Sequence, residues 1–195
     1  MKDIQIILAS KSPRRKEFLE KLGIDFKIIP AENPEDMTKY KNIKKLSKYL
    51  GEQKAQEVFD KTSGNRVVIG SDSMVYVKGQ LFGKPKDYAD GNKMLQALSG
   101  NWHKVYTSLC ILIEKDGIQK KYSSVFVVKV KFINLSDKMI KSYLATGDYK
   151  DKAGAYGVQS ASSKFIQKIN GDYASIVGLP FSTVYEILNK EGIVD

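Results

Sequence analysis

The stretch IQIILASKSPRRKEFLEKLG (residues 4–23) joins an apolar strand pattern to a helical pattern through a short polar turn. Residues 4–9 form an apolar run of strand length, and Phe18, Leu19 and Leu22 then recur at helical spacing. A strand that leads directly into a helix is a building unit of α/β folds. The stretch therefore predicts a strand, a turn and a helix in this order.

The rest of the chain continues this alternation. Lys115-Asp116-Gly117 lies between two β-type segments and predicts a hairpin, so antiparallel strands accompany the parallel ones. Gly51 is expected to weaken or interrupt the helix that contains it. We expect a single domain over residues 1–195, of the α/β class, with a mixed sheet. Expected helices cover residues 39–60, 87–98, 136–146 and 180–189, and expected strands cover residues 25–30, 66–70, 74–77, 102–114, 120–134, 165–169 and 175–177.

Size and composition indicate a globular protein, and the single cysteine fits a reducing compartment without proving one. The chain has 195 residues and a single cysteine, Cys110, which lies in an apolar run and is expected to be a buried core thiol. The apolar run at residues 4–9 is too short for a secretory signal, and no apolar stretch approaches the length of a membrane span. We therefore expect a cytoplasmic protein.

The net charge is +10, from 32 Lys and Arg against 22 Asp and Glu. Such a balance attracts polyanions, including nucleic acid, anionic membranes and phosphorylated small molecules. The lysines are widely scattered along the chain, which is equally typical of a solubilising surface. Charge alone therefore leaves these classes open.

The turn after the first strand is the first candidate site. A strand that ends in Ser10-Lys11-Ser12 and turns into a helix directs free backbone N–H groups outward, and such a helix start binds anions. Arg14 and Arg15 can make forked contacts to phosphate oxygens. Alternatively, Ser12 only caps the helix and both arginines are solvated.

Asp72 is the second candidate. It follows the apolar strand at residues 66–70 within Gly70-Ser71-Asp72-Ser73, so we expect it at a strand tip, where metal coordination or general-base chemistry is common. Capping of a turn is the alternative. The chain contains neither a Walker A pattern nor a Gly-x-Gly-x-x-Gly pattern, which argues against P-loop and dinucleotide-binding proteins.

Weaker signals lie elsewhere. Small residues surround Tyr156 and Gln159 in the segment 151–159, which suggests backbone packed against a ligand or, equally, a close-packed structural turn. His103 is the only histidine and is expected to be structural. Because histidine and cysteine clusters are absent from the sequence, any bound metal should be oxygen-liganded, hence Mg²⁺ or Mn²⁺.

Taken together, these segments resemble the Maf family from end to end, and their order and spacing make the resemblance specific. The segments that carry it are ILASKSPRRKEFLEKLG (7–23), GEQKAQEV (51–58), VIGSDSMV (68–75), FGKPKD (82–87), MLQALSGNWHKVYT (94–107), DKAGAYGVQ (151–159) and INGDYASIVGLP (169–180).

The resemblance implies a fold and an activity. It implies an elongated, twisted mixed sheet flanked by helices, with two lobes and a central cleft, as in Maf and ITPase proteins. It also implies a metal-dependent hydrolase that splits nucleoside triphosphates between the α and β phosphates. Family members are often homodimers and are linked to inhibition of septum formation and to removal of non-standard nucleotides.

The resemblance also assigns roles to individual residues. Asp72 matches the proton acceptor and, together with Glu35, a metal site, although Asp36 or Glu32 can align in place of Glu35. Gln159 matches a position tied to base choice. The phosphate site would be lined by Ser10, Arg14, Arg15, Lys54 and Lys84.

Three of these positions separate the substrate subgroups. Arg14 and Gln159 resemble the subgroup acting on dTTP and UTP, whereas the subgroup acting on 7-methyl-GTP usually carries tryptophan in place of Arg14. Ser73 stands where the dTTP/UTP subgroup usually has threonine. Ser160 stands where the family tends to have glycine, and Ser162 and Ser163 follow, so side chains in this segment can narrow or re-aim the base pocket.

Other functions remain as alternatives. A nucleic-acid-binding module would use the positive charge, but the sequence contains no nucleic-acid-binding motif or aromatic platform that we recognise, and we expect no stable nucleic-acid complex. A regulatory nucleotide binder without turnover would keep the fold but has no need of Asp72 and both arginines. 7-Methyl-GTP and other non-standard nucleotides are the alternative substrates.

Overall fold

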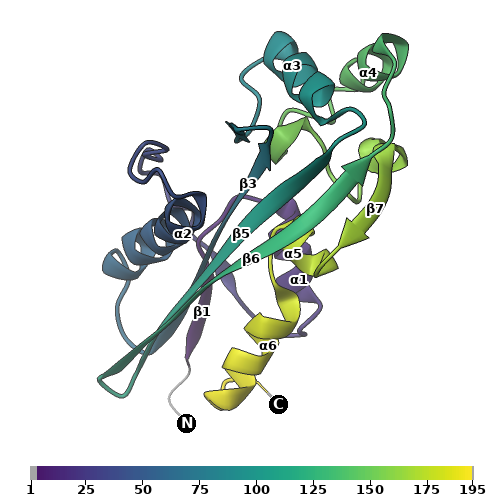
Figure 1. Ribbon diagram of the computed structural model, residues 1–195. Coiled ribbons are helices and arrows are strands. Elements are labelled where there is room, and N and C mark those ends of the chain that lie inside the picture. The colour runs from purple at the N-terminus through teal and green to yellow at the C-terminus, as the bar shows by residue number, and fades with distance from the viewer. Residues whose placement is uncertain (1–3, 195) are drawn as a thin grey trace. The chain divides into compact units, whose positions relative to one another are not determined.

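The computed structural model describes residues 4–194 and has the α/β architecture expected from the sequence (Figure 1). Its helices are α1 (Pro13–Glu20), α2 (Ile43–Asp60), α3 (Tyr88–Leu98), α4 (Asp137–Leu144), α5 (Tyr173–Val177) and α6 (Phe181–Lys190), with short 3-10 helices η1 (Ala153–Ala155) and η2 (Ala161–Phe165). Its strands are β1 (Gln5–Leu8), β2 (Lys27–Ile28), β3 (Arg66–Val77), β4 (Gln80–Phe82), β5 (Trp102–Lys115), β6 (Ile118–Phe132) and β7 (Ile166–Asn170).

The sheet is mixed, as predicted. Its strands follow the order β2-β1-β3-β5-β6-β7, and β4 pairs with β3. β1 runs parallel to both β2 and β3, whereas β3 with β4 and β6 with β7 are antiparallel. Within residues 4–194, no helix combines the length and apolar character needed to cross a bilayer.

The chain divides into two compact units, although the sequence predicts no linker between them. The first unit contains residues 1–72, 107–125 and 178–195, and the second contains residues 73–106 and 126–177. The strands β3, β5 and β6 each contribute residues to both units.

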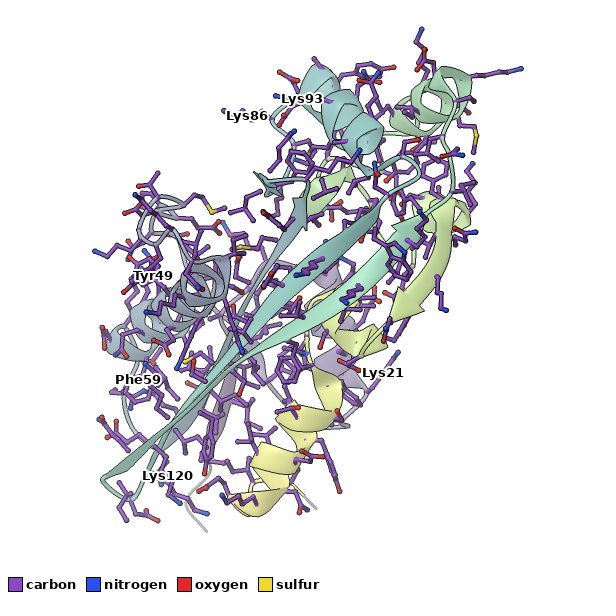
Figure 2. The ribbon with its side chains drawn as sticks, viewed as in Figure 1. Lys21, Tyr49, Phe59, Lys86, Lys93 and Lys120 are labelled. Atoms are coloured by element: carbon purple, nitrogen blue, oxygen red, sulfur yellow. The ribbon has the colours of Figure 1, made fainter. Side chains whose placement is uncertain are left out.

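In the first unit, helix α2 packs on β1, β3 and β5 through a continuous apolar cluster. Tyr49 and Phe59 mark this helix in Figure 2. Cys110 belongs to the cluster and is 1% exposed, and burial raises the pKa of its thiol to about 12. The expected core thiol is therefore confirmed. The buried members of the cluster are Ile7, Ala9, Ala55, Val58, Phe59, Val68, Cys110 and Leu112.

Two glycines allow α2 to approach the sheet closely. A β-carbon at Gly70 would lie 2.7 Å from both the backbone nitrogen of Ala55 and the carbonyl oxygen of Gly51. A β-carbon at Gly51 would collide with the hydroxyl of Ser108 on β5. Helix α2 continues through Gly51, so this residue does not interrupt the helix, contrary to the expectation. The glycine instead allows α2 to pack closely against Ser108.

We expect Gly70→Ala to lower the free energy of unfolding by about 1–3 kcal/mol, because the added methyl group meets backbone atoms that cannot rotate away. Urea denaturation measures the change. Gly83→Ala is the matched control, since nothing lies within 4 Å of its added β-carbon. Equal stability of the Gly70→Ala variant and the wild-type protein would contradict the close approach.

In the second unit, the core lies between one face of the sheet and the helices α3 and α4, which lie side by side (Figure 1). His103 is 2% exposed, and its Nε2 lies 2.7 Å from the hydroxyl oxygen of Tyr156. The edge of the ring also faces Phe132. These contacts agree with the structural role predicted for His103.

Several expected boundaries are wrong. Residues 66–70 and 74–77 form one continuous strand, β3, because the backbone of the polar residues between them stays extended. Residues 173–177 are helical and not a strand. The starts of α3 and α4 agree with the prediction, because each helix has a polar N-cap. The side chain of Asp87 accepts a hydrogen bond from the backbone N–H of Asp90, and that of Ser136 accepts one from the backbone N–H of Met139.

Candidate functional site

Asp72 lies inside strand β3 and not at a strand tip, which corrects the prediction from sequence. Its backbone N–H donates to the hydroxyl of Ser108 on β5, at 3.1 Å. The hydroxyl of the preceding residue, Ser71, donates to the carbonyl oxygen of Gly178 at 2.8 Å. The strand therefore continues through this polar segment because neighbouring elements satisfy its hydrogen-bonding groups.

Lys54 on α2 joins the two acidic residues predicted for the site. Its ammonium lies 2.5 Å from Oδ1 of Asp72 and 2.6 Å from Oε1 of Glu35. The side chain of Asp72 is 10% exposed and that of Glu35 is 43% exposed. Because the close packing of Gly70 brings α2 onto β3, Lys54 reaches Asp72. The structure thus brings three predicted site residues together.

The loop that carries Glu35 is held by Glu57, a residue that sequence reasoning missed. The Glu57 carboxylate accepts hydrogen bonds from the backbone N–H groups of Glu32 and Asn33, at 2.8 and 3.0 Å. Burial raises the pKa of Glu57, but its hydrogen bonds with Lys61 and the loop outweigh burial and lower the pKa overall. A carboxylate among the apolar positions of a predicted helix was the available signal.

The two alternatives to Glu35 point elsewhere. Asp36 accepts hydrogen bonds from the backbone N–H and the hydroxyl of Thr38, at 2.9 and 2.7 Å. Glu32 lies 4.0 Å from Lys11, and both side chains are largely exposed. Of the three acidic residues in this loop, the geometry therefore favours Glu35 as the partner of Asp72 at Lys54.

Arg15 and Ser10 are fixed at the turn between β1 and α1. Arg15 Nε donates to the carbonyl oxygen of Gly178 at 2.8 Å, and Nη1 donates to Ser10 Oγ at 3.0 Å. Ser12 makes no side-chain cap of α1, and its backbone N–H instead donates to Ser10 Oγ at 3.2 Å. The capping alternative for Ser12 is therefore wrong, and Ser10 organises the turn.

The charges around Arg15 belong to the same site. Burial is the main reason that the pKa of the Arg15 guanidinium is lowered, and the positive charge of Arg14 lowers this pKa further. The negative charges of Asp72 and Glu35 act in the opposite direction and raise it. Arginine nevertheless keeps its charge in proteins. The first unit thus holds a half-buried, fixed arginine whose charge interacts with both acidic residues.

The remaining predicted residues, Ser73, Lys84 and Gln159, belong to the second unit. Lys84 and Gln159 are exposed. The backbone N–H of Gly154 donates to the carbonyl oxygen of Gly83 at 3.0 Å, which ties the segment before Gln159 to the loop that carries Lys84. The juxtaposition of these residues with Asp72 stays a prediction.

The glycine-rich segment around Gln159 has structural reasons of its own. A β-carbon at Gly154 would lie 2.9 Å from Val75, so this glycine serves packing, as the structural alternative proposed. Ser160 and Ser162 both direct their hydroxyls to the carbonyl oxygen of Gly157, at 3.0 and 3.1 Å. Ser160 thus braces its own turn, and its effect on the base pocket stays a prediction.

A buried ion pair supports the same segment and was not foreseen from the sequence. Lys152 is 7% exposed, and its ammonium lies 2.9 Å from carboxylate oxygens of both Asp148 and Asp151. The apolar part of this side chain would contact a β-carbon at Gly157. The segment before Gln159 is therefore anchored by charge as well as by close packing.

The donor set in the first unit fits a small hard cation. The carboxylates of Glu35 and Asp72 converge on one positive group, the Lys54 ammonium. Mg²⁺ is commonly held by one or two carboxylates together with substrate phosphates and water. In the described chain, residues 4–194, no group of three or more His, Cys, Asp or Glu side chains is arranged to hold a metal. Water and phosphate oxygens would supply the further ligands of a metal here.

Known proteins resemble this chain over nearly its whole length. The dTTP/UTP pyrophosphatase of Thermosipho africanus (strain TCF52B) is 42% identical over 192 residues, which cover 98% of this chain and 96% of that protein. The dTTP/UTP pyrophosphatase of Aquifex aeolicus (strain VF5) is 39% identical over 187 residues, covering 96% and 95%.

A solved structure and a family match complete the comparison. The HAM1 protein from Coxiella burnetii superposes with a TM-score of 0.50 at 12% identity, over 96% of this chain and 100% of that chain. This likeness concerns the fold alone and agrees with the expected ITPase-like architecture. Residues 5–191 match the family described as Maf-like protein. Since this match spans most of the sequence and relatives near 40% identity share its full length, the chain belongs to the Maf-like protein family.

Proposed function

We propose that this protein hydrolyses dTTP and UTP to the monophosphate and pyrophosphate. The observation that carries the proposal is the cluster in which Lys54 bridges Glu35 and Asp72 while the fixed Arg15 interacts with both carboxylates. The names of relatives that share about 40% of the sequence support the choice of dTTP and UTP. A non-catalytic regulatory role has no use for a buried acid, Asp72, held beside Lys54 and Arg15.

The proposed mechanism follows from these charges. Ser10, Arg14 and Arg15 bind the triphosphate at the turn before α1, and Lys84 is assigned to the same phosphates. Lys54 can exchange a carboxylate oxygen for a phosphate oxygen when substrate arrives. Asp72 then accepts a proton from the water that attacks the α-phosphorus in line, and pyrophosphate leaves.

Glu35 and Asp72 are the residues that would hold Mg²⁺ or Mn²⁺ together with the phosphates. When bound, such a cation would neutralise phosphate charge and polarise the phosphoryl oxygens. The convergence of two carboxylates on one positive group supports this assignment. We further propose that the protein acts in the cytoplasm as a homodimer, and a link to septum formation stays a prediction.

The experiment that tests the function is release of pyrophosphate from a panel of nucleoside triphosphates with Mg²⁺ or Mn²⁺. We expect dTTP and UTP to react fastest, 7-methyl-GTP to react slowly, and EDTA to abolish turnover. Intact triphosphates after prolonged incubation with either metal would reject the proposed function. Preferential hydrolysis of 7-methyl-GTP would reject only the proposed base preference.

Gln159→Ala tests the base assignment. We expect this exposed residue to leave the free energy of unfolding within about 0.5 kcal/mol of wild type, because no buried contact is lost. The ratio of kcat/KM for UTP to that for CTP should fall by about tenfold, since hydrogen bonds to a base edge discriminate strongly. Equal losses for UTP and CTP would count against a role of Gln159 in base choice.

A further inference from the structure

One face of the sheet in the second unit carries a polar and aromatic surface. Its residues alternate along β3, β5 and β6 with buried core residues such as Val77, His103, Val105 and Val128. The side chains of a strand point alternately to opposite faces, so this surface faces away from the core. We call it the Trp102 face and define it by Tyr76, Lys78, Trp102, Lys104, Lys129 and Asn170.

The Trp102 face is hollowed into a cavity of about 430 Å³. This volume lies in the range of sites that bind small molecules or single groups of a larger ligand. Trp102 is 47% exposed there, which leaves much of its ring available for stacking. None of the residues lining the cavity is acidic. The cavity therefore suits a ligand that is both flat and negatively charged.

The three lysines of this face differ from the paired lysines of the protein. Lys54, Lys61 and Lys152 each have a carboxylate within 4.0 Å. The lysines of the face, Lys78, Lys104 and Lys129, have no such carboxylate among residues 4–194. Their charges are therefore not neutralised locally.

The positive charge continues beyond the cavity along the paired strands β6 and β7. Lys129 pairs with Asn170, and two residues further along the same ladder Lys131 pairs with Lys168. Residues two apart share a face, so Lys131 and Lys168 lie on the same face as Lys129. The ammonium of Lys131 donates to the carbonyl oxygen of Gly100 at 2.7 Å, whereas Lys168 is exposed. A chain of phosphates fits such a strip better than a single phosphorylated molecule does.

We propose that the Trp102 face binds single-stranded nucleic acid, contrary to the expectation from the sequence that no stable nucleic-acid complex forms. This function is independent of the proposed hydrolysis. Unstacked bases lie against Trp102 and Tyr76, and consecutive phosphates lie against the lysines, as in other single-strand sites. A duplex hides the flat faces of its bases and cannot stack in this way. A symmetric contact between two copies would bring the unpaired lysines of both together, which disfavours a dimer through this face.

Trp102 is the only tryptophan of the chain, so its fluorescence reports directly on this face. The probe is a 5′-hydroxyl oligo(dT) of about 12 nucleotides, which fits single-strand site sizes and carries no triphosphate. We expect the probe to quench Trp102 fluorescence. Affinity should fall by about 20-fold between about 50 and 200 mM KCl, because three lysines each neutralise one phosphate.

Variants then distinguish binding at the Trp102 face from nonspecific attraction to the positive charge of the protein. Trp102→Ala should weaken binding of fluorescein-labelled oligo(dT) about tenfold through lost stacking, whereas Tyr173→Ala, which removes another exposed aromatic ring, should have no effect. Replacing Lys78, Lys104 and Lys129 by Gln should remove most of the salt dependence. The matched control replaces three exposed lysines of the same unit, Lys86, Lys93 and Lys138, by Gln; Figure 2 labels the first two.

Three results would overturn the proposal. The first is that both triple lysine variants weaken oligo(dT) binding equally, and the second is that a duplex of the same length binds more tightly. The third is sedimentation that shows dimers for the wild type and monomers for Trp102→Ala, which would assign the face to a second copy. Pyrophosphate release by Trp102→Ala is measured in parallel and should match wild type. An inactive wild-type enzyme would therefore reject the proposed hydrolysis without affecting this test.

Discussion

Asp72→Asn should lower kcat for dTTP about 100-fold or more, comparable with the loss of a main general-base or electrostatic group. The amide has nearly the volume of the carboxylate but cannot accept the proton of the attacking water, and its metal affinity is weaker. The backbone N–H of residue 72 still donates to Ser108, and Lys54 keeps its second partner, Glu35. The variant is therefore expected to fold.

Steady-state release of pyrophosphate measures this loss, and urea denaturation checks the fold. Asp25→Asn is the control, because it removes one exposed carboxylate from the same unit. We expect that control to keep wild-type turnover. Turnover of Asp72→Asn within a few-fold of wild type would show that another group accepts the proton.

The second large effect concerns His103 and the stability of the fold at low pH. Burial lowers the pKa of His103 from 6.5 to about 4, while the polar backbone of Asn101 opposes the shift. Between these two pH values the unfolded chain binds a proton that the native protein does not bind, so stability rises with pH. His103 should therefore contribute about 3 kcal/mol above pH 6.5, and this contribution is lost as the pH falls toward 4.

Carboxylates also titrate near pH 4, so the test compares two proteins. Urea denaturation from pH 7 to pH 4 gives the free energy of unfolding of the wild type and of His103→Gln, whose amide can still bond Tyr156 but does not titrate. From pH 7 to pH 4, the free energy of unfolding of the wild type should fall by about 3 kcal/mol more than that of His103→Gln. Parallel curves for the two proteins would mean that His103 gains its proton at the same pH in the native protein and in the unfolded chain.

Most of the elements could be predicted because their signals are local. The caps Asp87 and Ser136, and the Asp116-Gly117 hairpin, act within a few residues of where they stand, so their positions agree with the structure. The continuous strand β3 could not be predicted. Ser71 and Asp72 resemble a turn until Gly178 and Ser108, both distant in sequence, satisfy their hydrogen-bonding groups.

The candidate site shows the same division. The sequence assigned Ser10, Arg15, Lys54 and Asp72 to a phosphate and metal site through the resemblance, and the structure brings these residues together. Sequence reasoning missed Glu57, because the loop that it holds lies 24 and 25 residues away. Nor could sequence reasoning place the hydroxyl of Ser160, which donates to the carbonyl oxygen of Gly157.

The sequence by itself determined the class of the fold, the positions of most of its helices and strands, and the family, because periodicity, caps and motif order are properties of neighbouring residues. Only the tertiary structure decided that Glu35 and Asp72 share Lys54, that Arg15 is fixed by Gly178, and that Trp102 lies beside Lys78, Lys104 and Lys129. These contacts join residues far apart along the chain, and for Lys54 and Asp72 they also depend on how closely the glycines of α2 and β3 let these two elements pack.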